Sequence, residues 1–118
     1  METLELMRKA VKCADDKKAS DIKVLSIGEL TTLADYFVIC HAKSNTQMNA
    51  IADEIEEKLK EDGLLMYNSG SKGSDQWILM DYGDVVVHIF NTESREFYGI
   101  EKLWADAENV DVSDIVSE

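Results

Sequence analysis

The sequence is poor in several features that define large classes of proteins. Cysteine occurs only as Cys13 and Cys40, without a short metal-type spacing, so we expect free reduced thiols rather than a disulfide framework. No apolar run is long enough to span a bilayer, and the first residues lack the apolar segment of a secretory signal. These absences predict a cytoplasmic protein that does not enter membranes and uses no metal or other cofactor.

Basic residues are scarce as well. Twelve Lys and Arg residues stand against 24 Asp and Glu residues, which gives a formal net charge of -12. That charge repels a phosphate backbone, and no segment is rich enough in Lys or Arg to form a separate nucleic-acid arm. Direct binding to nucleic acid is therefore disfavoured, whereas a basic protein surface would be attracted at long range.

Residue patterns typical of catalysis are also missing. Residues 70–75, GSKGSD, contain glycines and a lysine but not in the order of a phosphate-binding loop, which favours a mobile linker. Cys40 and His41 are neighbours on a predicted strand and point to opposite faces, so they cannot pair as nucleophile and base. The strand over 85–90 lacks the alternating carboxylates of metal-assisted phosphoryl transfer. We expect His41 and His88 to be hydrogen-bonded or surface residues.

The sequence does contain helix and strand patterns, and they are enough for a single domain. Its 118 residues, 45% of them apolar, suffice for one core. Periodicity predicts a helix ending near Lys18, strands over 21–27 and 34–40, a second helix, a short strand over 64–67, a hairpin over 77–90 and a third helix led in by 92–94. Ser44 and Gln47 form a capping-box pattern at the start of the second helix, and Gly63 can end it. The order predicts a single-domain α/β sandwich over 1–118, with a mixed sheet of about five strands.

The end of the sequence carries only acidic charges. From Ala105 onward there is no Lys or Arg. We therefore expect a short helical extension and then a solvated acidic C-terminal tail from about residue 106.

The hairpin has two faces of different character. With Tyr82 and Gly83 as a two-residue loop, Asp81 would face Asp84, and the pairing would continue outward to Trp77 with its partner His88. One predicted face is aliphatic and suited to burial under helices: Ile78, Met80, Val85, Val87 and Ile89. The other carries Trp77, Leu79, Val86, His88 and Phe90. Either a second layer of the chain or another protein could cover that ring-bearing face.

Two further features admit both a functional and a structural interpretation. Asp81 and Asp84 would place like charges across the hairpin end, at a stability cost that can reflect function, although Asp is also an ordinary turn residue. On the predicted third helix, Phe97 and Trp104 share one face, with Tyr98 beside it. Aromatic residues and Arg are enriched at binding hot spots, and core packing is the alternative.

Several of these motifs occur together in one known family. The motifs are Ala34-Asp35-Tyr36-Phe37-Val38-Ile39, the Ser44 and Gln47 helix start, the continuous run from Trp77 to Phe90, and Arg95-Glu96-Phe97-Tyr98 with Leu103-Trp104. With them the sequence resembles the ribosomal silencing factor family, also called the Iojap family, over nearly its whole length. Cys40-His41-Ala42 departs locally from the Thr-Gly-like strand ending expected there.

The resemblance implies a non-enzymatic translational repressor. Such a factor binds the large ribosomal subunit through a ribosomal protein on its intersubunit face, and it sterically blocks joining of the small subunit. The family's fold looks like that of nucleotidyltransferases, but the catalytic carboxylate pair is missing from this sequence. Fold similarity alone would not support an enzymatic function.

We expect the contact with a basic large-subunit ribosomal protein to combine aromatic anchors with complementary acidic charge. The predicted contact residues are Trp77, Asp81, Asp84, His88, Glu96, Tyr98, Glu101 and Trp104. Two alternatives stay open. One is a nucleotidyltransferase-like, nucleotide-binding enzyme that uses the loop over 70–75, and the other is a homodimer formed through the same apolar face.

Overall fold

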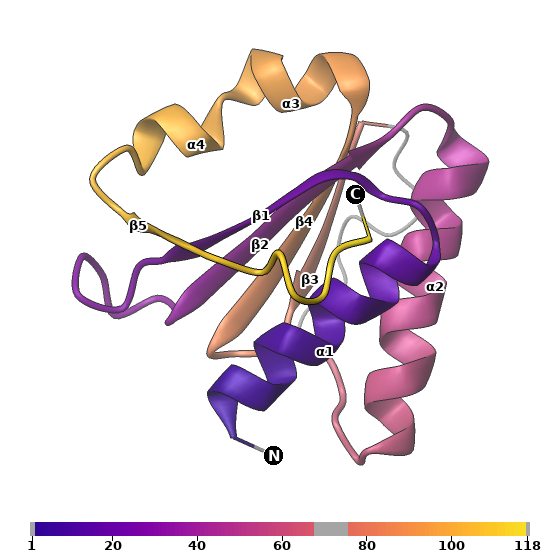
Figure 1. Ribbon diagram of the computed structural model, residues 1–118, viewed down its shortest axis with the longest axis horizontal. Helices are drawn as coiled ribbons and strands as arrows, with labels where there is room; N and C mark the ends of the chain where they lie inside the picture. The colour runs from indigo at the N-terminus through magenta and orange to yellow at the C-terminus, as the bar shows by residue number, and fades with distance from the viewer. Residues whose placement is uncertain (1, 68–75, 118) are drawn as a thin grey trace.

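The computed structural model describes residues 2–67 and 76–117, which form a five-stranded mixed sheet between unequal helical layers (Figure 1). The elements follow the chain as α1 (Thr3–Asp16), β1 (Ser20–Ser26), β2 (Tyr36–Ala42), α2 (Asn45–Glu61), β3 (Trp77–Asp81), β4 (Val85–Asn91), α3 (Thr92–Tyr98), α4 (Ile100–Leu103) and β5 (Glu108–Val110). The strand order is β3-β4-β2-β1-β5; β2 and β4 are parallel, and the other neighbouring pairs are antiparallel. The predicted α/β class with a mixed sheet is confirmed.

Helices α1 and α2 cover one face of the sheet and form the larger core with it (Figure 1). The buried stripe of α1 includes Met7, Ala10 and Val11, which recur at helical spacing and remove apolar area from water. The aliphatic face predicted for the hairpin lies in this core in full: Ile78, Met80, Val85, Val87 and Ile89. Both cysteines are free and buried, and burial raises the pKa of the Cys40 thiol to about 12.

The predicted start and end of α2 are confirmed. The hydroxyl of Ser44 accepts a hydrogen bond from the backbone N–H of Gln47 at 3.1 Å. The side-chain oxygen of Gln47 accepts from the backbone N–H of Lys43 at 3.3 Å, one residue earlier than in a standard capping box. At the other end, Gly63 follows the C-cap with a φ of +83°, a left-handed conformation that glycine adopts without steric cost.

The hairpin register differs from the prediction by two residues. Asp81 pairs with Val86 and Trp77 with Phe90, and the backbone N–H of Tyr82 bonds to the carbonyl of Val85 at 2.9 Å. The two-residue loop is therefore Gly83-Asp84, and the predicted pairing of Asp81 with Asp84 is wrong. The assignment of side chains to faces is unchanged, because a slip by an even number of residues preserves the alternation.

Three other predicted segments differ from the structure. Residues 64–67 form no strand, although the Tyr67 N–H bonds to the Asp81 carbonyl at 2.8 Å. The third helix is interrupted at Gly99, which has a φ of +55° and separates α3 from α4. Phe97 and Trp104 therefore do not share a face of one continuous helix.

The third difference is the C-terminal segment, which is not a solvated tail. Its residues 108–110 form β5 against β1, and the chain then returns across α1 (Figure 1). There Val112 is buried in the larger core, and the backbone N–H and hydroxyl of Ser117 both donate to Asp15. The predicted linker over 70–75 lies outside the described residues. Within the described part, no helix is both long and apolar enough to cross a membrane.

Candidate partner-binding surface

The sheet face opposite α1 and α2 carries a smaller core beneath α3 and α4 (Figure 1). Its buried members come from β1, β2, β4, α4 and the connecting loops: Leu25, Ile27, Ala34, Phe37, Ile39, Phe90, Ile100 and Ala107. Three further apolar side chains pack against it and are only partly buried: Trp77, Val86 and Trp104. A second layer of the chain thus buries His88 and Phe90 of the ring-bearing face, whereas Trp77, Leu79 and Val86 stay partly exposed.

An aromatic cluster ties this layer together. The Trp77 ring lies 5.1 Å from that of Phe90 and 4.9 Å from that of Tyr98, measured between centroids. Phe37 continues the cluster, with its ring 4.5 Å from His88 and 5.5 Å from Trp104 in edge-to-face arrangements. Four predicted contact residues, namely Trp77, His88, Tyr98 and Trp104, therefore belong to one continuous cluster.

His88 is a core residue of this cluster rather than a surface contact. It is buried, and its Nδ1 accepts a hydrogen bond from the indole N–H of Trp77 at 3.1 Å. Burial lowers the pKa of His88 to about 4, because a charged imidazole would lose its hydration there. The expectation of a hydrogen-bonded histidine is confirmed, and a direct contact with a partner conflicts with its burial.

The predicted carboxylates do not form one site. Asp81 accepts from the backbone N–H of Gly83 at 2.8 Å and Asp84 from the Thr3 hydroxyl at 3.2 Å, so both lie at the turn end of the hairpin. Glu96 lies on α3, which follows the opposite end of β4. The seven residues of β4, at about 3.3 Å each, separate its two ends by roughly 20 Å. The turn carboxylates thus lie apart from the group that includes Glu96 and Glu101.

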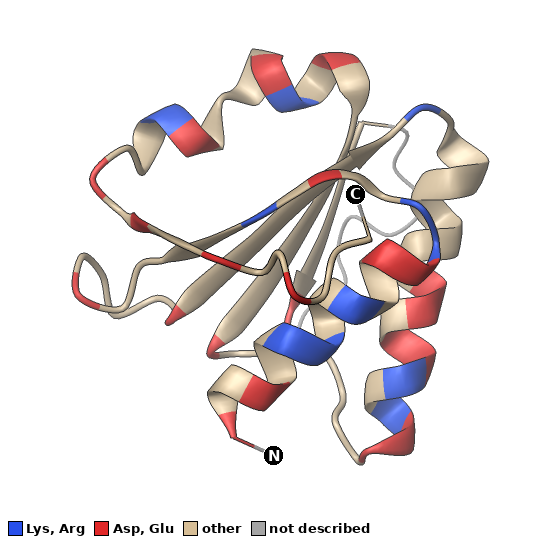
Figure 2. Ribbon diagram, in the orientation of Figure 1, with Lys and Arg blue, Asp and Glu red and all other residues tan. Residues whose placement is uncertain are grey.

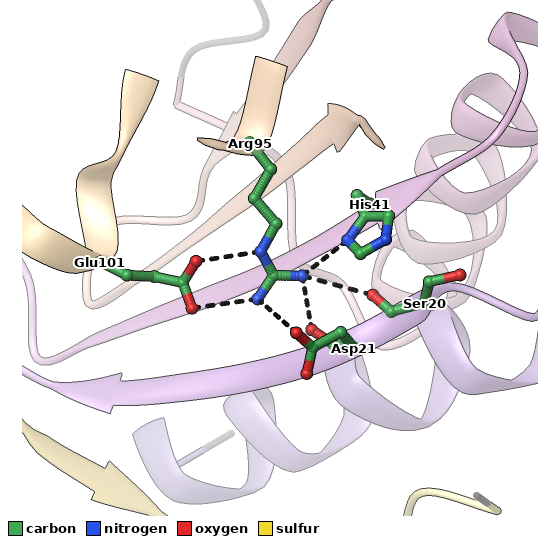
Figure 3. A network of polar contacts seen from close by, with 5 residues as sticks. All are labelled: Ser20, Asp21, His41, Arg95 and Glu101. Atoms are coloured by element: carbon green, nitrogen blue, oxygen red, sulfur yellow. Dashed lines mark hydrogen bonds and ion pairs between the residues drawn. The ribbon is translucent and has the colours of Figure 1, made fainter. Parts of the chain in front are cut away.

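Glu101 is engaged in a polar network centred on Arg95, which sequence reasoning did not place in the site. The Arg95 side chain is buried, and its Nε and Nη2 donate to the two carboxylate oxygens of Glu101 at 3.0 and 3.1 Å (Figure 3). Nη1 donates to the Asp21 carbonyl at 2.6 Å and to His41 Nδ1 at 2.9 Å. The hydrogen bonds from Arg95 lower the pKa of Glu101 and keep it ionised.

Exposed apolar side chains lie on the outer side of this layer. Phe97 on α3 is 82% exposed, and Leu103 on α4 is 76% exposed. Leu33, at 73%, is also exposed but lies in the connection between β1 and β2, outside this layer. These residues were not among the predicted contacts, although Phe97 and Leu103 adjoin Tyr98 and Trp104 in the motifs already singled out.

The same layer presents mainly negative charge to solvent. Figure 2 shows acidic residues along α3, α4 and the link to β5. Those with exposed side chains are Glu93, Glu96, Asp106 and Glu108, against one exposed cation in this stretch, Lys102. Exposed apolar side chains rimmed by one sign of charge are typical of a surface that binds an oppositely charged protein.

Comparisons with known proteins agree with the sequence motifs. The family described as "Ribosomal silencing factor during starvation" matches residues 1–118. Ribosomal silencing factor RsfS of Halalkalibacterium halodurans is 38% identical over 117 residues, covering 99% of this chain and all of that protein. A mouse protein named "Mitochondrial assembly of ribosomal large subunit protein 1" is 30% identical over 93 residues, covering 75% of this chain and 40% of its own length.

Solved structures show the same fold. A crystal structure of a protein from Chromobacterium violaceum superposes with a TM-score of 0.86 at 37% sequence identity, covering 89% of this chain and 88% of that one. Because the family match spans the full sequence and a relative is 38% identical over its whole length, the chain belongs to the ribosomal silencing factor family.

Proposed function

We propose that the protein represses translation by binding the large ribosomal subunit and sterically blocking the small subunit from joining it. The contact would be made with a basic ribosomal protein on the intersubunit face of the large subunit, in the cytoplasm. Family membership supports ribosome-associated regulation, and the name of the mouse relative refers to the large subunit. No catalytic step is needed for such an activity.

One observation carries the choice of binding surface. Phe97 and Leu103 extend into solvent from α3 and α4, among exposed carboxylates such as Glu96 and Asp106. Apolar anchors give affinity when a partner removes them from water, and the acidic rim attracts a basic partner and speeds association. The Tyr98 ring, which contacts those of Phe97 and Trp77, would hold Phe97 in place. Asp81 and Asp84 lie at the distant hairpin turn and would contribute little to partner binding.

Sedimentation with purified large subunits tests this surface. Phe97→Glu places a charge at a position that is 82% exposed, so the fold should survive, while an apolar contact with the partner would be lost. We expect at least tenfold weaker co-sedimentation, since a hot-spot residue contributes about 2 kcal/mol or more. Leu4→Glu is the matched control, because Leu4 is exposed on α1, on the opposite face of the sheet.

Each outcome of the experiment has a distinct meaning. Unmodified protein that fails to sediment with large subunits would refute the proposed function itself. If Phe97→Glu bound large subunits no more weakly than Leu4→Glu, the contact would lie elsewhere on the protein. Blocking is tested by adding small subunits to large subunits that have been preincubated with the protein; undiminished formation of complete ribosomes would refute the steric mechanism.

The other two candidate functions have weaker support. A nucleotide-binding enzyme would rest on the loop over 70–75, which lies outside the described residues. A homodimer could use Phe97 and Leu103 as well, and analytical ultracentrifugation of the unmodified protein and Phe97→Glu would detect it.

A further inference from the structure

Helices α3 and α4 are too short to hold their own orientation. They contain seven and four residues, whereas isolated helices shorter than about 12 residues are marginal in water. Their buried residues are Ser94, Arg95 and Ile100, and only the last of these is apolar. Contacts with the rest of the chain must therefore fix the direction in which Phe97 and Leu103 extend.

The Arg95 guanidinium makes those contacts with three other elements at once (Figure 3). From α3 it reaches α4 through both oxygens of Glu101, β1 through the carbonyl of Asp21, and β2 through Nδ1 of His41. A second, longer bond of 3.4 Å joins Nη1 to the Ser20 carbonyl. Nη1 has two hydrogens, so the long bond to Ser20 shares a hydrogen with one of the shorter bonds. The planar fork of an arginine reaches all of these partners at once, which a lysine ammonium cannot do with the same geometry.

The backbone is irregular where two of these partners lie. Asp21 has a φ of +47°, unusual for a residue other than glycine, and the β1–β2 register shifts between Ser20 and Lys23. Gly99, with a φ of +55°, sets the bend between α3 and α4, two residues before Glu101. One guanidinium thus connects the irregular start of β1 with the helix that follows the bend.

We propose that Arg95 is the positioning residue of the docking surface. Its fork to Glu101 holds α4 at a fixed angle to α3 across Gly99, and its bonds to β1 and β2 hold the helix pair on the sheet. Phe97 and Leu103 are thereby presented together. Arg95 is only 7% exposed, so it acts through the other residues and does not touch the partner. This inference rests on the proposed function.

The test compares Arg95→Lys, Glu101→Gln and the double variant in the full chain. We expect both single variants to bind purified large subunits more weakly, Arg95→Lys by about tenfold, and the double variant to be no weaker than Arg95→Lys, because Glu101→Gln breaks only the fork that Arg95→Lys has already broken. Amide hydrogen exchange in the free variants should be faster over 93–104 and unchanged over α2. Arg8→Lys is the matched control, because Arg8 forms an exposed ion pair with Asp114 beside α1.

Several results would overturn the proposal. Unchanged binding despite faster exchange over 93–104 would mean that the network stabilises the helices without serving docking. Additive losses in the double variant would mean that Glu101 contacts the partner directly. Faster exchange over α2 as well would mean a general loss of stability. If unmodified protein did not bind large subunits, the proposed function would fail, and the exchange measurement would still report whether Arg95 orders α3 and α4.

Discussion

The indole N–H of Trp77 donates to Nδ1 of His88 across neighbouring strands, at 3.1 Å. Because Nδ1 accepts this bond, the proton of the neutral imidazole must lie on Nε2. Within the described residues Nε2 is buried without a hydrogen-bond partner. The aromatic layer beneath the docking surface thus contains a histidine that cannot take up a second proton without disrupting its own contacts.

This pair predicts a pH dependence of stability. Burial lowers the pKa of folded His88 to about 4, from an ordinary value of 6.5. Between those values the unfolded chain binds a proton that the folded chain excludes, so the free energy of unfolding falls as the pH drops from 6.5 toward 4. One such group contributes a slope of up to about 1.4 kcal/mol per pH unit.

Urea unfolding at several pH values measures that slope. We expect His88→Phe to be less stable than the unmodified protein at pH 7, because the Trp77 N–H loses its acceptor. The variant should nevertheless lose less stability between pH 6.5 and 4. Parallel pH profiles for the two proteins would mean that other groups, such as Glu101, account for the acid sensitivity.

The faces of the hairpin were predictable from the sequence, but its register was not. Strand alternation alone assigns Ile78 to one core and His88 to the other, as observed. The register depends on which two residues form the loop, and Tyr82-Gly83 and Gly83-Asp84 both place a glycine there. The deciding contribution is tertiary: Tyr82 is buried in the larger core, so it cannot occupy an exposed loop.

Gly83 is the turn residue that should tolerate substitution least. Its φ is +87°, and a Cβ atom added there would lie 2.6 Å from Cε2 of Tyr67. We expect Gly83→Ala to lower the free energy of unfolding by about 1–2 kcal/mol from backbone strain, with the steric clash in addition. Denaturant unfolding of Gly83→Ala, Tyr67→Ala and the double variant separates the two causes. Tyr67→Ala should relieve only the clash, and complete rescue would mean that the backbone strain is negligible.

Ser44 tests the capping interaction that the sequence did predict. Its hydroxyl accepts from the Gln47 N–H, so Ser44→Ala should destabilise the protein by about 1 kcal/mol. Ser44→Asp, which keeps an acceptor at the cap, should cost much less in thermal or urea unfolding. Similar losses for both variants would show that the hydroxyl has another role.

The candidate site was predictable only where residue type determines location. Residue type predicts a common location for Trp77 and Trp104, and both pack against the smaller core, Trp104 edge-to-face with Phe37. The role of Arg95 is not predictable from the sequence, because its partners, Asp21, His41 and Glu101, come from three separate segments. A single buried arginine has no sequence periodicity. The exposure of Phe97 likewise depends on the break at Gly99, which local helix patterns did not reveal.

The C-terminal segment gives the sharpest contrast between the sequence-based expectation and the structure. A solvated tail would tolerate any substitution, yet Val112 is only 6% exposed and packs in the larger core. The acidic charge of this segment favours a solvated tail, but Val110 and Val112 alternate with the polar residues Asn109, Asp111 and Ser113, as in a strand with one buried face. We therefore expect substitutions at buried Val112 and at exposed Asp114 to change the free energy of unfolding by different amounts.

Val112→Ala removes two methyl groups from the core and should lower the free energy of unfolding by about 1.5–2 kcal/mol, at about 0.8 kcal/mol per buried carbon. Asp114→Ala removes only an exposed ion pair with Arg8 and should change it by less than about 1 kcal/mol. Urea unfolding of both variants measures the contrast. If Val112→Ala proved neutral, the segment after β5 would be a solvated tail after all. If it proved destabilising, the packing of Val112 in the larger core would help to hold β5 against β1. The connection from α4 to β5 would then be anchored at its far end.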